Sequence, residues 1–187
     1  MKKEKTEMII LCIIFVILII IGAFIRIPVP IVPFTLQFFF ITLAGLLLGP
    51  KYGCISVCIY TVLGLLGVPV FADGGGISYV LQPSFGYLIG FALGAFVTGK
   101  IANHTQEPSY KRLLIANFTG LGIIYLIGMI YYYIISNFYL GASIGVWPIL
   151  LYCFILAVPG DILLCGIAAI IGKKLIPLMR MQGIGCK

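Results

Sequence analysis

The amino-acid sequence predicts an all-α integral membrane protein built as a bundle of six transmembrane helices. Hydrophobic residues make up 62% of its 187 residues and charged residues only 9%, whereas soluble domains carry about 25% charged residues. The apolar residues are gathered in long runs that are separated by proline, glycine and polar residues. Runs of this length are typical of helices that cross a bilayer.

Six apolar runs follow one another along the chain. They are Met8–Ile25, Phe34–Leu48, Tyr52–Phe71, Ser84–Gly99, Leu113–Ile135 and a final run that ends at Ile171. Gly49 and Pro50 separate the second run from the third, and such residues commonly end helices. No linker or charged stretch divides the chain, so residues 1–187 are expected to form one domain.

The first run follows three lysines, as the apolar part of a signal peptide would. It is nevertheless 18 residues long, lacks a small-residue cleavage site before Arg26, and is followed by further spans. We therefore expect it to be a retained helix.

Basic residues predict the orientation of the bundle, because lysine and arginine are enriched in cytoplasmic loops. With both termini in the cytoplasm, eleven of the twelve basic residues fall inside and only Arg26 falls outside. The net charge of +7 then reflects topology and an anionic inner leaflet, and it gives no reason to expect nucleic acid as a partner.

The final apolar run is interrupted by Pro159 and Gly160. Proline is favoured in the first turn of a helix, where its missing N–H costs nothing. We expect a helix to begin at Pro159, with residues 147–158 forming a shorter segment before it. Asp161 then lies in the first turn, about 18 Å from the level of Lys173 and in the outer half of the membrane.

A glycine-rich polar loop leads directly into the fourth run, and residues 72–99 are predicted to organise the binding site. Gly86, Gly90 and Gly94 recur every four residues, so they share one helix face on which another backbone can approach closely. The loop and this glycine ridge are expected to form the wall and floor of a pocket inside the bundle.

Asp161 is the strongest candidate for a functional residue, since no other carboxylate is embedded in an apolar run. A charge at such a depth costs roughly 2.5–3.5 kcal/mol even on lenient scales. It therefore faces a cavity and binds a ligand, or else it is a structural partner for a buried hydroxyl or for Arg26.

Gln82, Ser84 and Tyr87 are candidates because they lie where the loop enters the fourth run. Gln82 has an amide donor and a carbonyl acceptor that suit a ligand with adjacent N–H and C=O groups, and its alternative role is a helix cap. Tyr87 is expected to supply an aromatic wall.

Arg26 and Phe34 flank a stiff outer segment in which Pro28, Pro30 and Pro33 restrict the backbone. This segment is expected to cover the pocket as a flap. Arg26 either binds a ligand carboxylate or extends to the membrane interface.

Catalytic and metal-binding patterns are weak. Residues 141–145 spell G-x-S-x-G around Ser143, but a nucleophile elbow needs a preceding strand and a histidine within reach. His104 is placed on the opposite side by the charge argument. Cys54 and Cys58 share a helix face without a histidine or carboxylate, which favours packing over metal binding. We therefore expect neither catalytic residues, nor a metal, nor a cofactor.

Three segments of the sequence form a recognisable set: Val32-Pro33-Phe34-Thr35-Leu36-Gln37, the segment Gln82-Pro83-Ser84-Phe85-Gly86-Tyr87-Leu88-Ile89-Gly90-Phe91, and Pro159-Gly160-Asp161. Together they resemble the BioY family, the biotin-binding S components of energy-coupling factor (ECF) transporters. The resemblance rests on the order and spacing of these segments, and it covers nearly the whole chain.

The resemblance implies a six-helix, multi-pass protein of the bacterial cytoplasmic membrane that captures biotin in an outward pocket. It also implies a membrane T component and two ATPase subunits as partners. Two N–H groups of the biotin ureido ring would suit Asp161, and its carbonyl would suit Gln82. The alternatives are an S component for another vitamin and a small intramembrane enzyme that uses Asp161 or Ser143.

Two features depart from the family pattern. Leu164 stands where the family often has lysine, so a lysine contact to biotin is missing. The first run also lacks the alanine-x-x-x-alanine pattern with which S components often dock on the T component.

Overall fold

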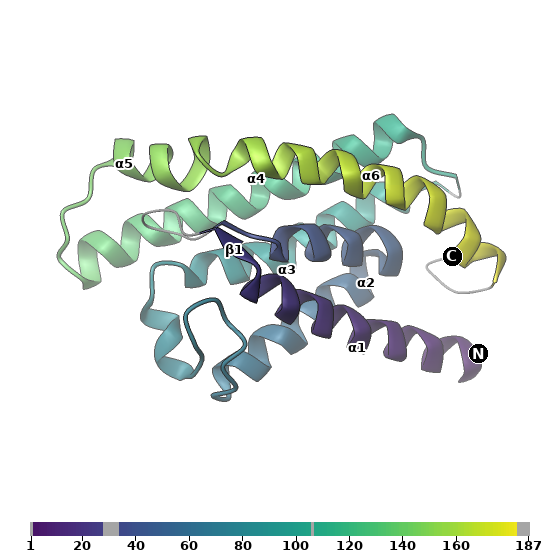
Figure 1. Cartoon of the computed structure of the whole chain (residues 1–187), viewed down its shortest axis with the longest axis horizontal. Helices are drawn as coiled ribbons and strands as arrows, with labels where there is room; N and C mark the ends of the chain where they lie inside the picture. The colour runs from purple at the N-terminus through teal and green to yellow at the C-terminus, as the bar shows by residue number, and fades with distance from the viewer. Residues whose placement is uncertain (1, 28–33, 106, 183–187) are drawn as a thin grey trace.

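The computed structural model describes residues 2–27, 34–105 and 107–182, and within these ranges the chain is mainly helical (Figure 1). Its helices are α1 (Lys2–Phe24), α2 (Gln37–Leu65), α3 (Phe85–Ala102), α4 (Tyr110–Ile134), α5 (Val146–Leu150) and α6 (Val158–Met181). Two-residue strands β1 (Arg26–Ile27) and β2 (Phe34–Thr35) pair in antiparallel fashion. The all-α class is as the sequence predicts.

Five helical stretches of the described chain are long and apolar enough to cross a membrane. They are Lys5–Phe24, Gln37–Leu65, Phe85–Ala102, Tyr110–Tyr139 and Val146–Met181. Each overlaps one or two of the apolar runs, and the six predicted spans correspond to five stretches because the second and third runs fall in the single stretch Gln37–Leu65. The third run was also predicted too long, since its helix ends at Leu65 and not at Phe71. Many of their outward side chains are large and hydrophobic, as a lipid environment requires.

Helix α2 folds back on itself at the predicted break. Gly49 has φ 77° and ψ −177°, a conformation that interrupts the helix immediately before Pro50. The amide of Gln37 donates a hydrogen bond of 2.7 Å to the Tyr60 hydroxyl, although a straight helix would separate these residues by about 35 Å. The segments before and after Gly49 therefore run side by side in opposite directions.

The glycine ridge of α3 packs against α4. A Cβ added to Gly90 would lie 3.0 Å from backbone atoms of Ile124, and one added to Gly86 would lie 2.2 Å from Tyr131. The ridge thus allows the close helix packing that the sequence predicts. It does not form the floor of a pocket, because the cavity described below is lined by other residues of α3.

The first turn of α1 and the last turn of α6 lie at one end of the long axis of the molecule, together with the adjoining ends of α3 and α4 (Figure 1). We call this the basic end. Two cations of α6 fasten residues between α3 and α4 there: Lys173 donates to the carbonyl of Pro108 at 3.2 Å and Arg180 to that of Thr105 at 2.9 Å. The short strands and α5 lie toward the opposite end, which we call the loop end.

Helix α6 begins at Val158, with Pro159 and Asp161 in its first turn, one residue before the predicted start. The residues before it form α5 and then a π-helical turn, η3 (Leu151–Ile155). A similar turn, η2 (Ile135–Tyr139), ends α4. The short segment expected before α6 is therefore present, and it brings Asp161 to the loop end of the bundle.

Candidate functional site

A cavity at the loop end is lined by side chains from α2, α3, α4, η3 and α6. A 3-10 helix, η1 (Ile77–Leu81), and the glycine-rich loop before it complete the lining. The cavity thus lies where the helices diverge and where the polar loop meets them. Of the predicted candidates, Asp161, Ser84 and Tyr87 line it.

Asp161 is 5% exposed and projects from the first turn of α6 into this cavity. One carboxylate oxygen, Oδ2, accepts a hydrogen bond of 2.5 Å from the Tyr125 hydroxyl of α4. The other oxygen, Oδ1, is buried and has no partner among the described residues. Since a buried unpaired acceptor is costly, this oxygen is suited to an N–H donor supplied by a ligand.

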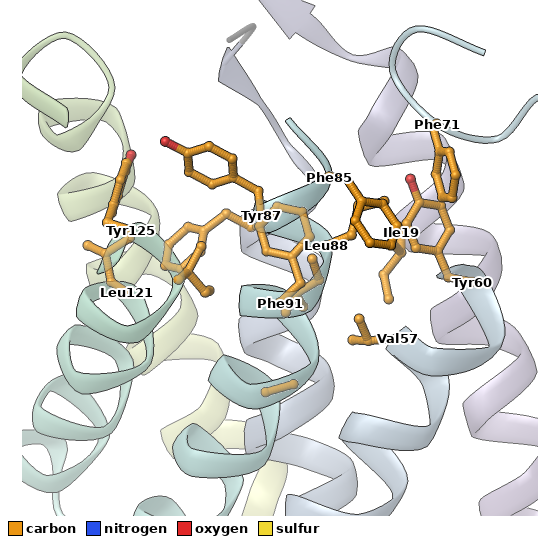
Figure 2. Close-up of a cluster of buried hydrophobic side chains, with 14 of the residues drawn as sticks. Ile19, Val57, Tyr60, Phe71, Phe85, Tyr87, Leu88, Phe91, Leu121 and Tyr125 are labelled. Carbon is orange, nitrogen blue, oxygen red and sulfur yellow. The ribbon is translucent and has the colours of Figure 1, made fainter. Parts of the chain in front are cut away.

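Aromatic side chains surround the carboxylate. Tyr87 and Tyr125 meet edge to face with ring centroids 6.2 Å apart, and Phe154 packs against Tyr125 at 5.3 Å. The cluster extends from Tyr125 of α4 through Tyr87 and Phe91 of α3 (Figure 2). Tyr87 therefore supplies an aromatic wall, and its buried hydroxyl lacks a partner among the described residues.

The far side of the same cluster carries a polar group that the sequence interpretation did not select. Gln37, at the start of α2, is 4% exposed and lines the cavity. It donates to Tyr60 and accepts a hydrogen bond of 3.1 Å from the Thr35 hydroxyl. The sequence did carry a signal for Gln37, because it is a polar residue inside the apolar run Phe34–Leu48. The same argument identified Asp161.

Gln82 does not line the cavity. It is the C-cap of η1, where its backbone is extended and its N–H donates to the carbonyl of Tyr79. The alternative interpretation, a cap at the start of the next helix, is not met either, since the N-cap of α3 is Ser84. Ser84 does line the cavity and donates to the Tyr79 hydroxyl at 3.3 Å. Burial raises the pKa of Tyr79, which keeps this phenol protonated.

Arg26 forms an ion pair at the rim of the cavity. Its guanidinium donates to Asp73 Oδ1 and to the carbonyl of Ala72, both at 2.7 Å, and these two residues line the cavity. Arg26 thereby fastens the glycine-rich loop to β1. Phe34 contributes its backbone to β2, but its side chain and the proline segment 28–33 lie outside the described residues.

Ser143 lies in an irregular loop between η2 and α5 with φ 49°. No strand precedes it, so the G-x-S-x-G pattern does not form a nucleophile elbow. Within the described ranges, no three metal-ligating side chains are grouped. Cys54 and Cys58 have sulfur atoms 4.0 Å apart and are free thiols.

The fold and the cavity define a small α-helical membrane protein that holds a ligand-binding cavity at one end of its bundle. The chain belongs to the BioY family, whose model matches residues 1–181.

Known relatives and one solved structure agree with this assignment. The chain is 41% identical to the probable biotin transporter BioY of Lysinibacillus sphaericus over 96% of this chain and 92% of the relative. It is 40% identical to the biotin transporter BioY of Thermotoga maritima, over 87% of this chain and 91% of the relative. It is also similar to the crystal structure of an S component for biotin from an ECF-type ABC transporter. The TM-score is 0.78 at 29% identity, and the match covers 94% of this chain and 93% of the solved chain. The family is one of transporters, so the chain is not an enzyme and the alternative enzymatic roles of Asp161 and Ser143 are wrong.

Proposed function

We propose that this protein captures biotin from outside the cell, as the substrate-binding subunit of an ECF-type transporter in the bacterial cytoplasmic membrane. The observation that carries the proposal is Asp161 with one unpartnered carboxylate oxygen in an aromatic cavity. Membership of the BioY family and the likeness to an S component for biotin support it.

Biotin matches the cavity in shape and in polarity. Its ureido ring carries two N–H donors and one carbonyl acceptor, and the unpartnered oxygen of Asp161 is positioned to accept from one donor. Tyr87 and Phe91 can pack against the fused rings. Gln37 is our candidate for the ureido carbonyl in place of Gln82, because only Gln37 lines the cavity.

The carboxylate of biotin would lie nearest to the rim. Arg26 is held there by Asp73, and the side chains of this ion pair are 45% and 47% exposed. A ligand carboxylate could compete with Asp73 for the guanidinium, since both are single negative charges that accept from Arg N–H groups. Phe34 stays a candidate contact from the same side of the site.

The finer topology is also a proposal. Counting the two antiparallel segments of α2 separately supports six membrane passages, and an even number places both termini on one side. The concentration of lysine and arginine toward that side supports a cytoplasmic location. We infer that a T component and two ATPase subunits act on this protein from the membrane and the cytoplasm, and that they supply the energy for transport.

Equilibrium binding of labelled biotin to the purified protein tests the proposed function. One biotin should bind per chain, unchanged and without ATP, and dethiobiotin should compete better than lipoate because it keeps the ureido group. Asp161→Asn should weaken binding by about 30- to 1000-fold, or roughly 2–4 kcal/mol, because its amide presents N–H groups toward those of biotin.

The folding control is thermal unfolding of the unliganded variant. Asp161→Asn should insert and purify like the parent, because replacing a buried charge does not in itself destabilise a bundle. Binding of biotin by Asp161→Asn with the affinity of the parent would show that the cavity around Asp161 is not the site.

The two glutamines give a second prediction. Gln37→Ala should weaken biotin binding by about 1–2 kcal/mol, or roughly 5- to 30-fold, because a neutral hydrogen bond is lost. Gln82→Ala should have the smaller effect, since Gln82 lies outside the lining. Isothermal titration calorimetry with biotin measures the loss of affinity in each variant. A greater loss for Gln82→Ala than for Gln37→Ala would make Gln82 the ligand contact.

Cysteine labelling of intact cells tests the orientation. In a background without Cys58 and Cys186, a membrane-impermeant maleimide should label Ser143→Cys at the loop end. It should not label Glu107→Cys, in the connection between α3 and α4, until the cells are lysed. The reverse pattern would place the termini outside.

A further inference from the structure

A second hollow lies at the basic end, away from the biotin site, between the last turn of α3 and the first turn of α4. It measures about 600 Å³. Its polar lining consists of Lys100 and His104 on the α3 side and of Ser109, Lys111 and Arg112 on the α4 side. Three permanent cations thus converge on one concavity at a helix end, and the proposed transport function does not use them.

The cations of this hollow are available to a ligand. Lys100 and Lys111 are exposed and Arg112 is half-buried. Within the described ranges their side chains form no hydrogen bond or ion pair; the Ser109 hydroxyl accepts from the backbone N–H of Arg112 at 3.3 Å, not from its guanidinium. Glu107, in the same connection, is not among the lining residues.

Hydrogen bonds from α6 hold residues that lie next to the hollow. Lys173 and Arg180 hold the carbonyls of Pro108 and Thr105. The Asn103 amide also donates to the carbonyls of Leu46 and Gly99 at 3.0 and 3.1 Å. Asn103, Thr105 and Pro108 are therefore held in place without using Lys100, Lys111 or Arg112, so a ligand would meet a preformed site.

Apolar side chains continue from the hollow along the membrane-facing surfaces of both helices. Ile101 and Ile115 are part of its lining. Phe96 lies one turn below Lys100 on the same face of α3, and Phe118 lies one turn beyond Ile115 on α4. These two phenylalanines are 39% and 43% exposed. The surface is thus cationic at the helix ends and apolar directly beneath them.

We propose that this hollow binds the phosphate headgroup of an anionic phospholipid, whose acyl chains lie along Phe96, Ile115 and Phe118. Basic pockets between transmembrane helices on the cytoplasmic side bind anionic headgroups. The apolar surface below the cations favours a phospholipid over free phosphate, which would gain nothing from it. The same surface faces the hydrocarbon layer, where a lipid is the abundant partner.

Native mass spectrometry of the purified full chain tests this proposal with phosphatidylglycerol and phosphatidylcholine of identical acyl chains. The parent should bind phosphatidylglycerol more tightly. Lys100→Gln/Lys111→Gln/Arg112→Gln should lose about 10- to 100-fold of its affinity for phosphatidylglycerol, because each cation near the surface contributes to anion binding.

The matched control is Lys2→Gln/Lys3→Gln/Lys5→Gln, which removes the same charge from the same end and should change the affinity by no more than about twofold. Both triple variants should bind biotin like the parent, which verifies folding independently of the lipid. If the triple variant of the hollow does not fold, Lys100→Gln and Lys111→Gln are compared singly with Lys2→Gln.

Three results would overturn the proposal. The first is an equal loss of affinity for phosphatidylglycerol in the control variant. The second is stoichiometric binding of inorganic phosphate at the affinity of phosphatidylglycerol, which would identify a site for a free anion. The third is unchanged lipid selectivity with failure to assemble with the ATPase subunits, which would identify a protein-docking surface.

Discussion

One buried carboxylate constrains the loop end of this protein. Asp161 lies inside an apolar bundle, where a charge is costly, and the described chain gives it a single hydrogen bond, from Tyr125. The first turn of α6 reduces that cost, because its free backbone N–H groups favour a negative charge nearby. The other carboxylate oxygen can accept a hydrogen bond from a ligand. We regard this bond as the basis of ligand recognition.

The rest of the fold brings groups to that carboxylate from distant parts of the sequence. The ridge of Gly86, Gly90 and Gly94 lets α3 approach α4 closely, and this packing places Tyr87 beside Tyr125. The reversal of α2 at Gly49 returns Tyr60 to Gln37 at the opposite wall. Close packing in the middle of the bundle thus leaves its loop end free to hold a cavity.

Much of this arrangement follows from sequence, and the exceptions have physical reasons. The spans and the start of α6 could be predicted because apolar runs, glycine and proline act locally. Gln37 was missed and Gln82 preferred because both amides lie near the start of an apolar run, and only the tertiary fold decides which amide faces the cavity. The ion pair between Arg26 and Asp73 could not be predicted either, because Asp73 is distant in sequence and only the folding of its loop brings it to Arg26.

The central claim is that Asp161 accepts a hydrogen bond from the ureido group of biotin, and a ligand–protein mutant cycle tests it most directly. Binding of biotin and of its analogue with both ureido nitrogens methylated would be measured for the parent and for Asp161→Asn. Our account predicts that methylation weakens binding to the parent by at least about tenfold more than binding to Asp161→Asn, in which the bond is already lost. Equal weakening in both proteins would contradict it.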